Sequence, residues 1–177
     1  MSFPGSLERF DKKKHSREGF ACGEPSLDFF LQQLAGQQQS RNQAVTYVYV
    51  EKGRILGYFT LSAYSLLKPE LEGARAAKEP YERVPALMLG RLARDLSMKG
   101  KRSEGGVSFG TFLLLAAMRK AAQLSLELGA VFLVLEALHE DAAKFYHSTG
   151  FGFEALPDHP LKLVLELKHL QKQFGVL

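Results

Sequence analysis

A basic, glycine-rich segment is the part of the sequence whose residue types most directly suggest a binding site. Residues 96–110 (LSMKGKRSEGGVSFG) contain four glycines and three basic residues, Lys99, Lys101 and Arg102. Backbone N–H groups in such a loop, together with the N-terminus of a following helix, form a site for an anion. The glycines fit neither a Walker A motif nor a G-x-G-x-x-G dinucleotide fingerprint. A flexible surface loop is therefore the alternative interpretation.

Tyr146 is the second feature of the sequence that could belong to a functional site, because its hydroxyl can take part in catalysis. It ends the stretch 142–146 (AAKFY), which is followed by Gly150 and Phe151. In a helical register Phe145 faces a core, so Tyr146 projects to one side of it. From the residues alone, the simplest interpretation is a tyrosine at the edge of the core whose hydroxyl finds a polar partner.

No metal site and no disulfide are expected. The five histidines are scattered without metal-ligand spacing, and the one cysteine, Cys22, is interpreted as a small buried hydrophobe.

The net charge of +4 fits an anionic ligand, such as a nucleotide cofactor or RNA. The longest apolar run, Phe112 to Met118, is too short to span a bilayer, and the N-terminus lacks a secretory signal. We expect a cytoplasmic chain with no membrane partner, folded as a single domain over residues 1–177.

The first half of the chain predicts one helix and three strands. Pro25 suits a first helical turn, and an apolar stripe follows it before Gly36, so residues 24–36 predict a helix that ends at this glycine. Residues 44–50 and 54–66 predict two strands joined by a hairpin turn at 51–53. Residues 68–81 predict an irregular connection with one helical turn. Residues 84–93 predict a strand interrupted by Gly90, where an internal glycine marks a bulge or a close backbone approach.

The second half predicts two helices between further strands. Residues 111–128 have one nearly all-apolar face and predict the longest helix, ending at Gly129. Residues 130–135 predict a strand buried on both faces, and residues 141–148 a short helix stopped by Gly150. Residues 151–153 and 161–167 predict two closing strands. This order predicts an α/β or α+β fold, with helices packed on a mixed sheet.

Four groups of residues form a set: Phe20-Ala21-Cys22-Gly23 followed by Leu27-Asp28, Gly57-Tyr58-Phe59, Leu89-Gly90-Arg91-Leu92-Ala93 with Asp95, and Phe145-Tyr146 with Gly150-Phe151. Taken together, they resemble the GNAT acetyltransferases, and more closely the toxin-type members found in toxin–antitoxin operons. The resemblance covers roughly residues 18–168 and implies a GNAT-like, mostly antiparallel twisted sheet of six to seven strands with helices on both faces. Arg91 and Asp95 are expected to pair at the end of a strand.

The resemblance implies acetyl-CoA as cosubstrate and no metal. In such enzymes a bulged strand, here around residues 92–94, offers backbone groups to the pantetheine arm, and the following loop and helix start hold the pyrophosphate. The family pattern is Arg or Gln, two residues, Gly, one residue, and Gly or Ala. Counting back from Gly110, Ser108 replaces the middle glycine and Gly105 the Arg or Gln. Alternatively the motif starts at Lys99, with about six extra residues before Gly110. The candidate cofactor-binding residues are Leu92, Ala93, Arg94, Lys99, Lys101, Gly105, Gly106, Val107, Ser108, Phe109, Gly110 and Thr111.

The resemblance implies an N-acetyltransferase whose acceptor, in the toxin-type branch, is the α-amine of aminoacyl-tRNA, so that translation is blocked. It assigns to Tyr146 the role of the general acid that protonates the departing thiolate, while the strand bulge offers an N–H to the oxyanion. An α-amine, with a pKa of ~7.7–8.0, loses its proton more easily than a lysine at ~10.4, so no strong base is required. Glu136 and His139 are interpreted as polar groups at a strand end and a helix cap.

An antitoxin protein and a homodimer are further implied as partners. Basic residues in 9–17 and 75–83 are candidate tRNA contacts, although Glu8, Asp11 and Glu18 interrupt the first cluster and a solvated mixed-charge segment is the alternative. Two other functions stay open. One is acetyl transfer to a peptide or small-molecule amine. The other is a non-catalytic GNAT-fold module whose degenerate loop binds no acetyl-CoA and which binds an antitoxin.

Overall fold

The computed structural model describes residues 2–176, whose strands form one seven-stranded mixed sheet in the order β1-β2-β3-β4-β5-β7-β6. This confirms the predicted sheet of six to seven strands. The strands are β1 Ser6–Arg9, β2 Val45–Glu51, β3 Arg54–Leu67, β4 Arg83–Arg94, β5 Phe132–Glu136, β6 Glu154–Leu156 and β7 His159–Glu166. The α-helices are α1 Pro25–Phe29, α2 Ala35–Ser40, α3 Gly73–Lys78, α4 Phe109–Leu128, α5 Glu140–Ser148 and α6 Leu167–Gln173.

The chain divides into two compact units. The first contains Met1–Ser62 and Gly90–Ala117, and the second contains Ala63–Leu89 and Met118–Leu177. The three points at which the chain passes from one unit to the other fall inside β3, β4 and α4. Each of these points lies within regular secondary structure, so neither unit is one continuous segment of the chain.

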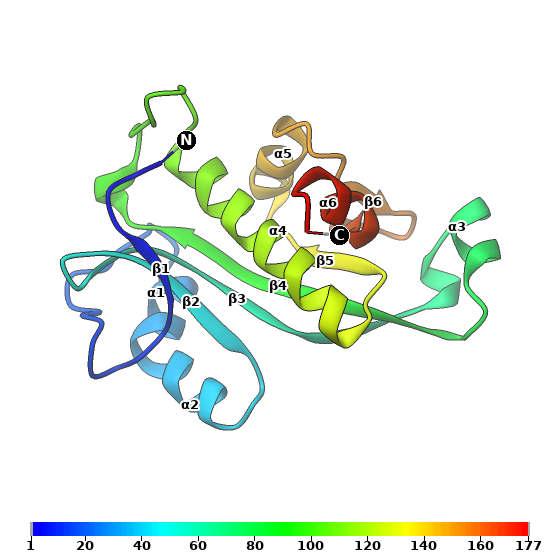
Figure 1. Ribbon diagram of the computed structural model, residues 1–177, viewed down its shortest axis with the longest axis horizontal. Helices are drawn as coiled ribbons and strands as arrows, with labels where there is room; N and C mark the ends of the chain where they lie inside the picture. Colours follow the sequence, from blue (N-terminus) through cyan, green and yellow to red (C-terminus); the bar gives the residue numbers. More distant parts are fainter. Residues whose placement is uncertain (1, 177) are drawn as a thin grey trace. The chain divides into compact units, whose positions relative to one another are not determined.

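In the first unit, helices cover both faces of the sheet (Figure 1). Adjacent residues of a strand point to opposite faces. Tyr58 of β3 points to the helical stretch that begins with α1, where its hydroxyl donates to the Leu27 carbonyl at 2.7 Å and its ring stacks on Phe30. Gly57, the residue before it, lies against Phe109 and Leu113 of α4. The core on the α1 side is built from Phe10, Phe20, Leu27, Phe30, Leu31, Ala35, Val48, Val50, Ile55, Tyr58 and Ala93.

The first helical stretch is longer than the sequence predicts. A π-helical turn, Phe30–Leu34, joins α1 directly to α2, so the stretch runs to Ser40 and the predicted end at Gly36 is wrong. Ala35 is fully buried, and the position of a Cβ on Gly36 would lie 3.9 Å from the Phe10 ring. Packing against the sheet therefore carries the helix past a residue that has a low intrinsic helix propensity.

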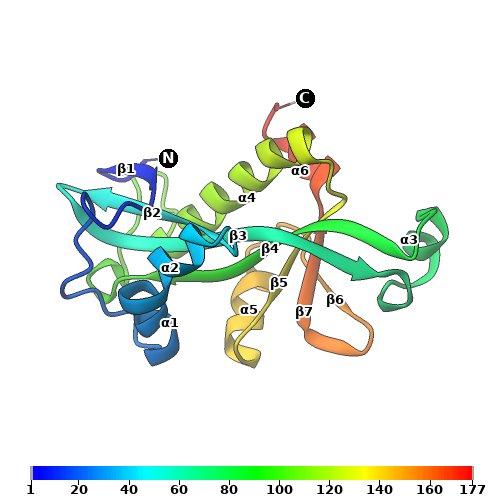
Figure 2. The same ribbon diagram turned by 90° about the horizontal axis from the view of Figure 1, so that it is seen from below.

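In the second unit, β5 is the central strand (Figure 2). It pairs in parallel with β4 from Ala86 to Leu89 and antiparallel with β7, which in turn pairs antiparallel with β6. Phe132 to Leu135 are buried, which confirms the predicted strand with two covered faces. The expected strand at 151–153 is wrong, because Gly150 and Gly152 have positive φ angles of 72° and 91° and turn the chain before β6 begins.

The edge strand β1 and the terminal helix α6 were not predicted from the sequence. All four residues of β1 are exposed, so they carry no alternating apolar pattern. In α6, Leu167, Leu170 and Gln171 are buried, and the Gln171 side-chain amide donates to Ser125 Oγ at 2.8 Å. Among the described residues, no helix is both long and apolar enough to cross a bilayer.

Candidate active site

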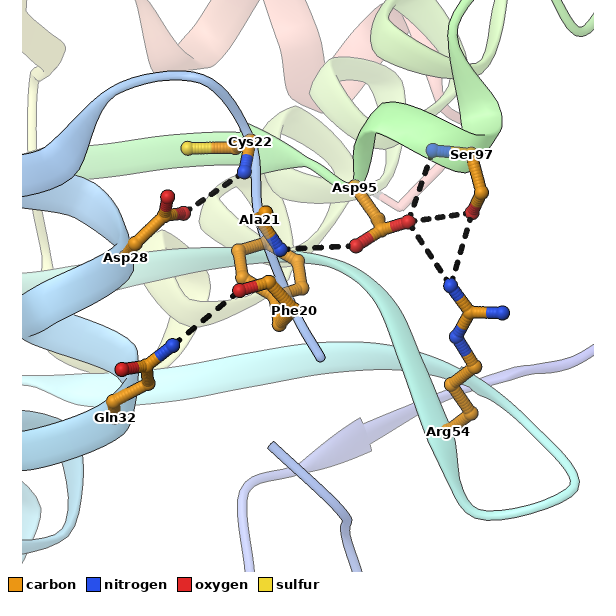
Figure 3. A network of polar contacts seen from close by, with 8 residues as sticks. All are labelled: Phe20, Ala21, Cys22, Asp28, Gln32, Arg54, Asp95 and Ser97. Atoms are coloured by element: carbon orange, nitrogen blue, oxygen red, sulfur yellow. Dashed lines mark hydrogen bonds and ion pairs between the residues drawn. The ribbon is translucent and has the colours of Figure 1, made fainter. Parts of the chain in front are cut away.

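Asp95 is the polar centre from which the glycine-rich loop begins (Figure 3). It follows β4 directly, and only 3% of its surface is exposed. Its carboxylate accepts hydrogen bonds from the backbone N–H of Ala21 at 3.1 Å and of Ser97 at 2.9 Å, and from the Ser97 hydroxyl. The Arg54 guanidinium lies 3.2 Å from the same carboxylate. Asp95 therefore ties β3, the segment after Phe20 and the loop to one point.

The hydrogen bonds of Asp95 and the charge of Arg54 change its pKa more than its burial does. Burial alone would raise the pKa of Asp95, but hydrogen bonds from Ser97 and Ala21 and the charge of Arg54 lower it overall. The carboxylate is therefore ionised near neutral pH and acts as a fixed structural anchor. The predicted pairing of Arg91 with Asp95 is wrong: the Arg91 guanidinium lies over the Phe30 ring, 3.7 Å from its centroid, and Arg54 takes its place.

The second half of the loop is a small closed hairpin. Arg102 and Ser108 form an antiparallel bridge. Ser103 N–H donates to the Val107 carbonyl at 2.9 Å, and Gly106 N–H donates to the Ser103 carbonyl at 2.8 Å. The Arg102 guanidinium also donates to the Gly106 carbonyl at 2.7 Å. The extra residues of this loop are thus joined into a hairpin by their own hydrogen bonds.

The helix α4 begins at Phe109, two residues before the predicted start at 111, and Ser108 caps its N-terminus. Its hydroxyl accepts from Thr111 N–H at 3.2 Å, and Phe109 N–H donates to the Lys101 carbonyl at 3.1 Å. Within residues 2–176 the N–H of Gly110 has no acceptor. Several N–H groups of the predicted anion site are therefore used inside the protein, and Gly110 offers one in the first turn of α4, where the helix dipole favours an anion.

A glycine in β3 permits α4 to lie close to the sheet at this end. A Cβ on Gly57 would lie 2.9 Å from Leu113 Cδ2, 2.9 Å from Phe109 Cε1 and 3.1 Å from the Ala93 carbonyl oxygen. Any larger residue would collide with all three. The Gly57-Tyr58 pair therefore places the first turn of α4 on one face of β3 and the α1 stretch on the other.

The predicted cofactor-binding residues fall on consecutive elements of the first unit. Residues 92–94 end β4, residues 99–108 form the loop, and residues 109–111 are the first turn of α4. Lys99 and Lys101 are exposed. Arg54, which fixes Asp95, was missed because 41 residues separate the two and no local pattern connects them.

Tyr146 belongs to the second unit and lies on α5. His139 caps this helix, as predicted, by accepting from Ala142 N–H at 3.2 Å. The Tyr146 ring makes edge-to-face contacts with Phe145 and Phe153, at centroid distances of 5.2 and 5.7 Å. Its hydroxyl forms no hydrogen bond with the described residues, and burial raises the pKa of Tyr146 to about 12. The phenol is therefore protonated over the whole physiological pH range and can act as a proton donor.

Cys22 has the environment of a packed thiol. Burial raises its pKa to about 12, so almost no thiolate forms near neutral pH. Its backbone N–H donates to Asp28 at 2.9 Å, which holds the start of α1 (Figure 3). Among the described residues, no group of His, Cys, Asp or Glu side chains is placed to hold a metal ion.

The mixed seven-stranded sheet and the capped helix after a glycine-rich loop agree with the GNAT-like fold that the sequence predicts. No protein-family model matches the chain. A tRNA-acetylating toxin of Mycobacterium tuberculosis (strain ATCC 25618 / H37Rv) is 31% identical over 156 residues, which cover 88% of this chain and 89% of that protein. The chain belongs to the family of tRNA-acetylating toxins, the GNAT-type toxins of toxin–antitoxin modules.

Two solved structures of the toxin AtaT agree with this assignment. AtaT complexed with acetyl-methionyl-tRNAfMet has a TM-score of 0.82 and 29% identity, covering 96% of this chain and 98% of that one. A tyrosine-to-phenylalanine mutant of AtaT, bound to acetyl-CoA and to the C-terminus of the antitoxin AtaR, has a TM-score of 0.76 and 29% identity over 96% of this chain and 97% of that one.

Proposed function

We propose that this chain transfers the acetyl group of acetyl-CoA to the α-amine of an aminoacyl-tRNA, with Tyr146 as the general acid. The observation that carries the proposal is the match to a tRNA-acetylating toxin along 88% of the chain. The complex of AtaT with acetyl-methionyl-tRNAfMet supports the choice of acceptor, because it contains the product of this reaction. The AtaT mutant bound to acetyl-CoA supports the choice of donor.

The residues of the first unit fit the phosphates of the donor. Gly110 supplies an N–H in the first turn of α4, and the exposed Lys99 and Lys101 supply positive charge beside it. We assign the diphosphate to this turn and loop. The end of β4, residues 92–94, is assigned to the pantetheine arm. When bound, acetyl-CoA supplies a thioester whose carbonyl carbon accepts the amine and whose sulfur leaves.

The proton balance of the transfer requires an acid but no strong base. The amine nitrogen forms a bond to the acetyl carbon, the carbon–sulfur bond breaks, and the sulfur needs a proton to become a thiol. The Tyr146 phenol donates this proton and recovers one from solvent, which receives the proton that the nitrogen loses. At pH 7 roughly a tenth of an α-amine is uncharged, since its ordinary pKa is ~7.7–8.0, whereas for a lysine at ~10.4 the uncharged fraction is below about one in a thousand.

The test replaces Tyr146 with phenylalanine. Tyr146→Phe keeps the ring that packs on Phe145 and Phe153 and removes only the hydroxyl, so the melting temperature should hardly change. We expect the rate of acetyl transfer from labelled acetyl-CoA to charged tRNA to fall by roughly 10²–10⁴-fold, the usual contribution of a general acid. Tyr81→Phe is the matched control, because Tyr81 is 74% exposed. An unchanged rate in Tyr146→Phe would remove Tyr146 from the mechanism.

We also propose that the chain binds an antitoxin and forms a homodimer. The complex of AtaT with the C-terminus of AtaR supports the first partner. Co-purification with the product of a neighbouring small gene tests for the antitoxin, and light scattering of the purified chain measures its oligomeric state.

A further inference from the structure

A polar groove of about 1040 Å³ lies in the first unit, away from the loop and helix assigned to acetyl-CoA. One wall is the N-terminal segment 8–17, and the other is formed by helical residues 32–40. We call it the N-terminal groove. Arg9, Lys12, Lys14 and Arg17 line the first wall, and the second presents the side chains of several glutamines. Cations and amides along one channel match the contacts that proteins make to phosphates and sugars of a nucleic acid.

The two carboxylates in the wall are already engaged with neighbouring groups of the protein. Glu8 accepts from the Ser6 hydroxyl and from His15 Nε2, both at 2.8 Å, and these two hydrogen bonds lower the pKa of Glu8. Asp11 accepts from the Lys13 N–H at 2.8 Å. The salt bridges of the described residues do not include Arg9, Lys12 or Lys14. The acidic residues thus build the wall, while Arg9, Lys12 and Lys14 are exposed to solvent.

Hydrogen bonds within the first unit hold the wall in a fixed shape. His15 is 5% exposed, and its Nδ1 accepts from Asp11 N–H at 3.0 Å, so Nε2 carries the proton that is donated to Glu8. The Arg17 guanidinium donates to the Gln32 carbonyl at 2.6 Å and joins the two walls. The Gln39 side chain donates to the Phe10 carbonyl at 2.9 Å and accepts from Thr46 N–H at 3.1 Å. A binding surface with this support loses little conformational freedom when it is occupied.

The groove is also connected to the candidate active site within the same unit. Ser16 N–H donates to the Gly53 carbonyl at 2.9 Å, and Ser16 forms a bridge with Arg54. Arg54 in turn holds Asp95, where the acetyl-CoA loop starts. The β2–β3 turn therefore sets the position of both features.

We propose that the N-terminal groove binds the sugar–phosphate backbone of the tRNA substrate, away from the aminoacyl end. This inference rests on the proposed function and adds to it a site for the body of the acceptor. A polyanionic backbone fits better than a protein partner, because most of the lining residues are charged or carry side-chain amides, whereas charged residues are depleted in the cores of protein interfaces. Lys12 and Lys14 are the residues assigned to phosphate contacts.

The test measures binding of deacylated tRNA to the whole protein as a function of salt concentration. Deacylated tRNA carries no α-amine, so this readout is independent of acetyl transfer. Each lost phosphate contact flattens the plot of log K against log salt by ~0.7–0.9. For the double variant Lys12→Gln and Lys14→Gln we expect a slope reduced by about 1.5 and binding weakened about tenfold near 0.1 M salt. Lys168→Gln with Lys172→Gln, two exposed lysines of α6, is the matched control and should bind as the parent does.

Two further arms decide between this proposal and its rivals. Gln33→Glu adds a negative charge to the opposite wall, where Gln33 is exposed, and should weaken tRNA binding as well. The second arm measures binding of poly-glutamate, a polyanionic peptide that represents an acidic protein partner. If the lysine variant loses binding of poly-glutamate but binds tRNA as the parent does, the groove is a protein interface and the proposal is wrong. If tRNA binding depends on Lys12 and Lys14 but the protein transfers no acetyl group, the proposal for the groove stands and the proposed function is wrong.

Discussion

At the scale of single residues, the environment of Tyr146 predicts the pH dependence of the reaction. Its pKa of about 12 means that the acid form of the phenol persists far above neutral pH. The amine must lose a proton before it attacks, so kcat/KM should rise with pH through ~7.7–8.0. It should then stay level, with no falling limb up to about pH 9.5. Initial rates with charged tRNA across this range provide the measurement, and a fall below this limit would mean that a more acidic group donates the proton.

Asp95 shows that a sequence does not reveal which residues of different strands form an ion pair. Its position after β4 was visible in the motif, and an ionic partner was expected nearby in the chain. The actual partner, Arg54, comes from another strand, and Arg91 instead lies over an aromatic ring. Spacing along one strand gives the face on which a side chain lies, but pairing between strands depends on register, which a single sequence does not fix.

At the scale of elements, two glycines predict opposite outcomes for the same substitution. Gly57→Ala forces a Cβ to within 2.9 Å of two α4 side chains and 3.1 Å of a β4 carbonyl oxygen, so we expect a loss of about 1–3 kcal/mol in the free energy of unfolding. The same shift displaces the first turn of α4 and should weaken binding of acetyl-CoA. Denaturant titration and calorimetry with acetyl-CoA measure the two effects.

Gly36→Ala is the matched control. Gly36 lies in α2, and the position of its Cβ would be in ordinary contact, 3.9 Å from the Phe10 ring. Alanine has the higher helix propensity, so this variant should be more stable by up to about 1 kcal/mol. A destabilised Gly36→Ala, or a Gly57→Ala with parent stability, would contradict the packing described here.

The elements that the sequence predicted well are those with strong apolar patterns. The β2–β3 hairpin, β5, α4 and α5 lie close to their predicted positions, because burial gives each a clear period or run. The exposed strand β1 has no such pattern, and its pairing with β2 comes from tertiary structure. The glycine-rich loop before α4 lies where the sequence predicted it, but the hairpin within 101–109 was not foreseen, since its hydrogen bonds join backbone atoms that any residue supplies.

At the scale of the whole molecule, the path of the chain predicts cooperative unfolding. Each passage between the two units occurs inside β3, β4 or α4, so neither unit is a continuous segment that folds alone. We expect one thermal transition, with equal calorimetric and van't Hoff enthalpies. Scanning calorimetry of the full chain makes the measurement. Two resolved transitions would show that the units unfold separately, and would contradict the single domain that we propose.

The closed hairpin of the glycine-rich loop offers a place for chemical labelling. Its stem, the Arg102–Ser108 bridge, sets the start of α4, and Glu104 lies exposed at the tip beyond it. A fluorophore attached through Glu104→Cys would leave the stem and the helix cap in place. The native thiol, Cys22, would compete little for a maleimide because it is so weakly acidic. The protein is thus suited to single-site attachment of an optical reporter without prior removal of its own cysteine.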